Sequence, residues 1–199
     1  MVTADLNLIK AKDQRAMFIC KHVDLEKTSK TLLTADQTVS AFIQTLQQNA
    51  ALKDIIGVIA QTLPVREAVY WACLCVRDSF ADNPPADDLL AIKAAEQWVY
   101  QPDEDNRRLN EKLAEKLEHA TAAAWVANAV FWSGGSITPK DDAKVDPPEG
   151  VFGKAISGAV NLASAHEEIN QMQSLQNRFI DRGINIAQGG KGDNVNTKS

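Results

Sequence analysis

Apolar residues recur every third or fourth position along almost the whole chain, and no segment alternates apolar with polar residues for the length of a strand. The first spacing places apolar side chains on one face of an α-helix, whereas a half-buried strand needs a period of two. We therefore predict an all-α single domain of about seven or more antiparallel helices, with no β-sheet. Short turns between the helices favour a helical bundle or a short helical-hairpin array.

Capping residues and helix breakers divide this pattern into separate helices. Thr34 followed by Gln37 forms a capping-box pattern, and Thr121 offers a later N-cap. Asp103 and Asp105 are alternative N-caps for another helix. Helices are expected over residues 34–46, 52–63, 64–80 with Pro64 in the first turn, 89–99, 105–117 and 121–133, and from residue 149 onward.

Two details of these helices follow from the same spacing. Leu109, Leu113 and Leu117 are each four residues apart, so we predict that they form the buried face of their helix. Near the C-terminal end the apolar period continues past residue 163. The last element is therefore either one long helix or two helices joined near residues 164–168.

The domain boundaries follow from length and composition. A chain of 199 residues with 45% apolar content can bury one sizeable core. We expect residues 34–188 to form an all-α domain. Residues 1–33 should form a weakly structured helical segment, with helices near 11–21 and 25–33, and residues 189–199 should form a disordered tail.

Charge and cysteine content limit the partners and the compartment. The net charge of −5 disfavours nucleic acid, whose binding requires clustered Lys and Arg. The chain has no apolar run long enough to span a membrane and no signal-peptide pattern, so we expect a cytoplasmic protein without membrane insertion. Cys20, Cys73 and Cys75 have no disulfide or metal-ligand spacing and should be free thiols. We expect no metal and no cofactor.

No combination of residues along the chain is typical of a catalytic site, so we expect a protein that is not an enzyme. Glu96 lies on the predicted buried face of its helix and therefore needs a partner. Arg66 or Arg77 could form a structural ion pair with it. The alternative is an enzyme whose site is assembled from Arg66, Glu67, Glu96 and Trp132.

The apolar helix over residues 122–131 leads into paired glycines and a long loop. We place this loop at residues 133–149, which exceeds the usual length of a connection in a compact domain and is typical of a functional loop. Gly134 or Gly135 should supply the left-handed conformation that ends the helix. The candidate partner-binding residues are Trp132, Ser133, Gly134, Gly135, Ser136, Pro139, Pro147 and Pro148.

Several ordered segments carry a family resemblance. They are the stretches over residues 63–73, 94–99, 131–136, 155–160 and 183–187, together with Pro147-Pro148. From about Cys20 to Gly190 the chain resembles an uncharacterised bacterial family, a domain of unknown function often encoded among type VI secretion system components. One departure is the charged stretch at residues 140–144, where that family is typically proline-rich and apolar.

The resemblance implies a cytoplasmic accessory role and no established activity. We therefore expect a non-enzymatic protein-binding module, which would be an adaptor or chaperone-like protein that binds a secretion spike or effector component. An immunity protein that binds a toxin is a further alternative, since an acidic chain suits a basic partner.

Overall fold

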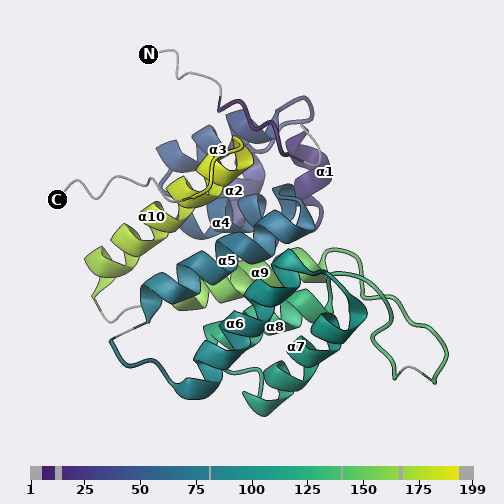
Figure 1. The fold of residues 1–199 in the computed structure, drawn as a ribbon. Helices are drawn as coiled ribbons and strands as arrows, with labels where there is room; N and C mark the ends of the chain where they lie inside the picture. The colour runs from purple at the N-terminus through teal and green to yellow at the C-terminus, as the bar shows by residue number, and fades with distance from the viewer. Residues whose placement is uncertain (1–5, 12–14, 81, 140, 166–167, 193–199) are drawn as a thin grey trace. The chain divides into compact units, whose positions relative to one another are not determined.

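The computed structural model describes residues 6–11, 15–80, 82–139, 141–165 and 168–192. These residues contain ten α-helices and no strand, apart from one isolated bridge between Arg15 and Thr38 (Figure 1). The all-α prediction is confirmed. The chain forms two compact units: unit 1 comprises Met1–Pro64 and Ser164–Ser199, and unit 2 comprises Val65–Ala163.

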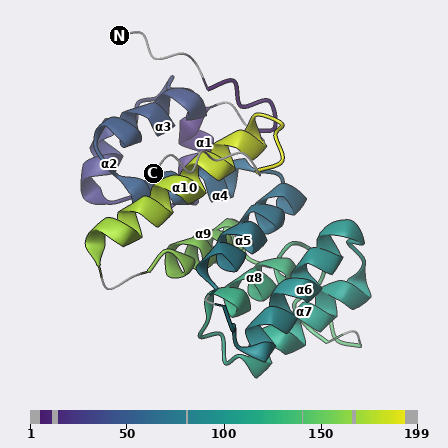
Figure 2. The same cartoon turned by 60° about the vertical axis from the view of Figure 1, so that its left-hand side comes forward.

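Unit 1 is built around α4. It contains α1 (Ala16–Cys20), α2 (Lys27–Leu32), α3 (Val39–Gln48), α4 (Leu52–Thr62) and α10 (Ile169–Ala187). Every residue of α4 from Asp54 to Thr62 is buried, as expected of a helix with neighbours on several sides. Helices α1, α3 and α10 pack against it, and Figure 2 shows α10 alongside α4. Segments far apart in the sequence therefore share one core.

Polar side chains of α4 hold the segment that precedes α3. The buried carboxylate of Asp54 accepts the backbone N–H of Glu26 at 3.3 Å, at the start of α2. Gln61 Nε2 donates to the carbonyl of His22 at 3.3 Å. The two helices expected within residues 1–33 are thus present, although both are shorter than predicted.

The start of α3 differs from the prediction. The N-cap is Thr38, whose hydroxyl accepts the Ala41 N–H at 3.1 Å. Thr34 keeps half of a capping box, because its N–H donates to Gln37 Oε1 at 3.2 Å, but no helix follows it directly. Two threonines four residues apart compete as caps, and the hydroxyl nearer the apolar run fills the role.

The C-terminal apolar period is divided between two helices. Helix α9 (Val151–Ala163) ends in unit 2, and α10 starts at Ile169 in unit 1. After α10 the chain turns back, where Asn185 Oδ1 accepts the Gly192 N–H at 2.9 Å and Arg182 Nε donates to the Gly192 carbonyl at 3.0 Å. The beginning of the predicted tail is therefore attached to α10, while residues 193–199 lie outside the described residues.

Unit 2 is built around α8 (Ala122–Phe131). Its other helices are α5 (Val65–Ser79), α6 (Ala86–Tyr100), α7 (Glu104–Lys116) and α9. All residues of α8 except Ala122 and Trp125 are buried, and α5, α6, α7 and α9 all pack against it. The alanines allow these close approaches, and Trp125 lies against Gly158 of α9.

Helix α7 buries Leu113 as predicted, but the rest of its buried face differs from the predicted leucine row. Its buried residues are Arg107, Asn110, Leu113 and Ala114, whereas the side chain of Leu109 is 45% exposed. Residues four apart advance by about 400° on a helix, so a row of three leucines drifts around the axis. Of the predicted caps, Asp103 caps α7 and Thr121 caps α8. None of the described helices has the length and apolar character of a membrane span.

Candidate functional site

The long loop at residues 133–149 connects α8 and α9 of unit 2. Trp132 is the C-cap of α8, and the described residues between it and Val151 contain no helix. Gly135 has a φ of +69°, so it supplies the left-handed conformation within the predicted pair of glycines. In Figure 1 the loop extends outward beyond α7 as a hairpin.

Hydrogen bonds tie the two sides of this hairpin together. The Ile137 N–H donates to the Val145 carbonyl at 2.8 Å, and the Val145 N–H donates to Ser136 Oγ at 3.1 Å. Thr138 donates its N–H to Ser136 Oγ at 3.2 Å and its hydroxyl to the Ala143 carbonyl at 2.8 Å. We call residues 136–138 and 143–145 the loop stem. Its conformation depends on two hydroxyl side chains rather than on a strand ladder.

Arg107 connects the beginning of the loop to α7 and α8. Its side chain is only 5% exposed, and its Nη atoms donate to the carbonyls of Phe131 at 2.7 Å and Ser136 at 2.9 Å. Nε and Nη2 also donate to the two carboxylate oxygens of Glu104, both at 2.7 Å. A Cβ atom on Gly135 would come within 3.1 Å of the guanidinium, so the chain approaches Arg107 closely at a glycine.

Arg108 binds the loop stem from the same helix. Its Nη2 donates to the carbonyls of Ser136 at 2.9 Å and Thr138 at 2.6 Å. The rest of the guanidinium binds Glu104 at 2.9 Å and Glu111 at 3.0 Å. We call Glu104, Arg107, Arg108 and Glu111 the arginine cluster. Both arginines also lie near the Phe131 ring, at 5.0 and 5.4 Å from its centroid.

Two members of the arginine cluster, Glu104 and Arg108, have pKa values that are shifted toward their charged forms. Hydrogen bonds from Arg107, and then from Arg108, lower the pKa of Glu104 from 4.5 to about 2. The hydrogen bonds to Glu111 and Glu104 raise the pKa of Arg108 further above its ordinary value. The loop stem is therefore bound by charge-assisted hydrogen bonds, which are stronger than neutral ones.

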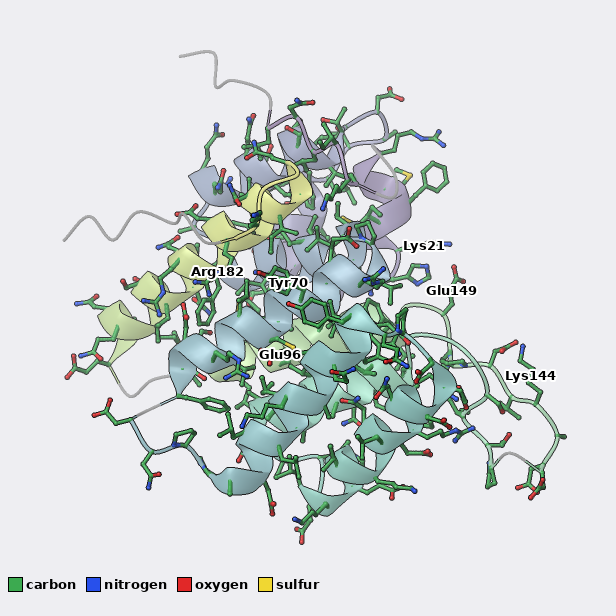
Figure 3. All side chains as sticks on the ribbon, viewed as in Figure 1. Lys21, Tyr70, Glu96, Lys144, Glu149 and Arg182 are labelled. Atoms are coloured by element: carbon green, nitrogen blue, oxygen red, sulfur yellow. The ribbon has the colours of Figure 1, made fainter. Side chains whose placement is uncertain are left out.

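The predicted binding residues fall into two groups. Trp132, Ser133, Gly134 and Ser136 are half-buried near the start of the loop, and Pro147 is half-buried near its end. Gly135, Pro139 and Pro148 are exposed, as are all residues from 141 to 146. Figure 3 shows Lys144 at the outer part of the loop, where its Nζ lies 2.9 Å from Asp146. The accessible surface is thus centred on residues 141–146, which overlap the charged stretch noted in the sequence but were not among the candidate binding residues.

Sequence reasoning also missed the arginine cluster. A signal was present, because Arg107, Asn110 and Ala114 follow helical spacing and an arginine on a buried face needs partners. The same argument was applied to Glu96. The leucines at 109, 113 and 117 led us to predict a buried face that did not include Arg107.

Glu96 of α6 pairs with Arg77 of α5. Arg77 Nη2 donates to Glu96 Oε2 at 2.6 Å, and Nε donates to Oε1. Arg66 instead donates its Nε to the Val99 carbonyl at 2.9 Å. Of the two partners considered, Arg77 is therefore the one that binds Glu96. The side chains of Arg77 and Glu96 are 36% and 28% exposed, so the pair is only partly buried.

The residues of the alternative enzyme site are only partly brought together. An open pocket of about 260 Å³ is lined by Arg66, Glu67 and Tyr70 of α5 and by Val99 of α6. Glu96 is engaged by Arg77, and Trp132 caps α8. In the described part of the chain, no three His, Cys, Asp or Glu side chains are grouped as metal ligands.

Comparisons with known proteins address the family but no activity. Residues 42–187, well over half of the chain, match the model of a family of unknown function (DUF6931). The expectation of an uncharacterised family is thereby confirmed. Searches of curated proteins and of solved structures found no match.

Proposed function

We propose that this chain, which belongs to the family of unknown function DUF6931, is a protein-binding module that contacts its partner through the loop at residues 133–149. One observation carries the proposal: the loop is a projecting hairpin with an exposed outer part and a stem bound by the arginine cluster. A loop held in one conformation loses less conformational entropy on binding than a free one.

The outer part of the loop has the chemistry of a protein contact. Asp141, Asp142 and Asp146 are exposed and acidic, and Lys144 lies among them. Val145 adds an apolar side chain that is 46% exposed. A charged surface of this kind fits the polar rim of a transient protein interface, and its acidic residues suit a basic partner.

The role in the cell is proposed from the resemblance described above. The chain would act in the bacterial cytoplasm as an accessory, adaptor or chaperone-like protein of a type VI secretion system, with a spike or effector component as its partner. The charged stretch at residues 140–144 departs from the family pattern and would give this chain its own partner specificity.

The test is affinity capture from the native bacterium, with mass spectrometry of the bound proteins. A variant carrying Asp141→Ala, Asp142→Ala and Val145→Ala is compared with Lys112→Ala/Glu115→Ala, which alters exposed residues of α7. We expect the loop variant alone to lose a specific partner, with an unchanged circular dichroism spectrum. If the loop variant keeps every partner, the loop is not the interface.

An enzyme remains the second candidate, because the open pocket at Arg66, Glu67 and Tyr70 could hold a small molecule. Its test is a thermal-shift screen of small metabolites against the wild-type chain and Arg66→Ala. A compound that stabilises only the wild type would favour this alternative. A toxin among the captured proteins would instead favour an immunity protein.

A further inference from the structure

The two arginines of the cluster have different roles, although they are neighbours in sequence. Arg107 binds the carbonyl of Phe131, the last residue of α8, and so takes part in helix packing as well as in the loop. Outside its own helix, Arg108 donates only to Ser136 and Thr138, both in the loop stem, among the hydrogen bonds of the described residues. Its side chain is 21% exposed against 5% for Arg107.

We infer that Arg108 is a positioning residue that holds the loop stem in the conformation that binds the partner. The inference rests on the proposed function, since it assumes that the loop is the interface. Arg108 itself would not need to touch the partner. It would act through the carbonyls of Ser136 and Thr138, which are two residues apart on one side of the hairpin.

The geometry suits arginine and no other residue. One Nη atom spans the two loop carbonyls while Nε and the other Nη bind Glu104 and Glu111. The two carboxylates fix the plane of the guanidinium, and the plane fixes the direction of the donors toward the loop. A lysine would keep the charge at this position, but it could not make all four contacts in fixed directions.

The rest of the stem depends on the conformation that Arg108 sets. Ser136 Oγ accepts the N–H groups of Thr138 and Val145, so a shift of the Ser136 backbone would disturb both sides of the hairpin. Among the described residues of the loop, the two sides would then be connected by the hydrogen bonds from Ile137 and Thr138 and, at the tip, by the Asp142 N–H that donates to the Pro139 carbonyl. Removing Arg108 should therefore populate open conformations of the loop. The affinity for a partner falls in proportion to the fraction of chains that keep the binding conformation.

The experiment compares Arg108→Met with Lys112→Met, an exposed position one turn further along α7. Hydrogen exchange of the Ile137 and Val145 amides reports loop order without any partner. Binding of the partner captured by the wild-type chain reports the interface. For Arg108→Met we expect exchange about tenfold faster and binding about tenfold weaker, if the binding conformation falls to about a tenth of the population. We expect no change in either measurement for Lys112→Met.

A cross-link provides the rescue. Ile137→Cys and Val145→Cys place two thiols across the stem, where the backbones are already hydrogen-bonded. The native cysteines should not interfere, because all three are buried, and burial raises the pKa of Cys20 to about 12 and also raises the pKa of Cys73. Oxidation of this pair in the Arg108→Met background should restore slow exchange and wild-type affinity. Reduction should remove the rescue.

Each result has a defined meaning. If Arg108→Met loosens the loop but binds normally, or leaves loop exchange unchanged, the positioning role is wrong while the proposed interface stands. If the loop variant with three alanines also binds normally, the proposed function itself is wrong. If Arg108→Met fails to fold, Arg108→Lys replaces it. The lysine variant should then show an intermediate loss that the cross-link restores.

Discussion

In unit 2, arginine binds glutamate both at the Arg77–Glu96 pair and in the arginine cluster, and these two sites differ in what they hold together. The Arg77–Glu96 pair joins two regular helices, and each guanidinium donor faces one carboxylate oxygen. In the arginine cluster two guanidiniums share Glu104 and also bind backbone carbonyls of α8 and the loop. The first site joins two helices that also pack against each other and bury apolar side chains of their own. The second provides contacts that an irregular segment cannot make for itself.

The largest effect is expected at Arg107. Arg107→Met should lower the free energy of unfolding of unit 2 by about 3 kcal/mol, because the buried carbonyl of Phe131 loses its donor and the carbonyl of Ser136 is left with the Arg108 donor alone. All four tryptophans of the chain lie in unit 2, so urea unfolding followed by tryptophan fluorescence reports this unit. A loss no greater than that of Arg77→Met would remove the distinction between the two sites.

The next effect is expected at Gly135. Gly135→Ala should destabilise unit 2 by about 1–2 kcal/mol, because its φ is +69° and the new Cβ would lie 3.1 Å from the Arg107 guanidinium. Gly158→Ala is the matched control, since a Cβ there meets the Trp125 ring at an ordinary 3.4 Å. Both variants are measured by the same fluorescence-detected unfolding. If both variants lower the unfolding free energy by the same small amount, the loop can adjust at position 135. The close approach of Gly135 to Arg107 would then not be critical for stability.

The contrast between the two sites explains how much the sequence could predict. Glu96 was found because helical spacing put it on a buried face, and an arginine on the neighbouring helix was the natural partner. In a regular helix, the position of a residue in the sequence determines the face on which its side chain lies. The all-α fold and several helix caps could be predicted from the same regularity. The choice between Arg66 and Arg77 depended on which side chain could reach Glu96, and residue spacing does not predict that.

The arginine cluster could not be predicted in the same way. Its main acceptors are backbone carbonyls at Phe131, Ser136 and Thr138, and every residue has a carbonyl. Which of them turns toward α7 depends on the path of the loop, and that path depends in turn on Gly135 and the Ser136 hydroxyl. The exposed outer part of the loop was noted in the sequence for its charge alone, because the prolines and glycines drew attention to the ends of the loop.

Glu104 of the arginine cluster should make the stability of unit 2 depend on pH. The pKa of Glu104 is about 2 in the folded protein and 4.5 ordinarily, so folding favours its ionised form. Its contribution is fully present above pH 4.5 and is lost as the pH falls from 4.5 toward 2. Because the Glu104 side chain is 56% exposed, solvent screening limits this contribution to about 1 kcal/mol.

The measurement compares the wild type with Glu104→Gln by fluorescence-detected unfolding between pH 2 and pH 7. The difference in unfolding free energy should be constant above about pH 5.5 and should disappear near pH 2. If the difference in unfolding free energy does not change over this pH range, Glu104 contributes through packing and not through its charge. The cluster would then not depend on its charges.

The smallest effect is expected at the Arg77–Glu96 pair. Glu96→Ala should lower the unfolding free energy by about 0.5–1 kcal/mol, because both side chains are roughly a third exposed and part of the attraction is screened by water. A double-mutant cycle with Arg77→Met isolates the interaction from other effects of each change. The coupling should decrease when the salt concentration is raised to 1 M, where the screening length is about 3 Å. A coupling energy above about 2 kcal/mol would mean that this pair stabilises the protein as strongly as the arginine cluster does. The backbone carbonyls bound by the cluster would then not explain a difference between the two sites.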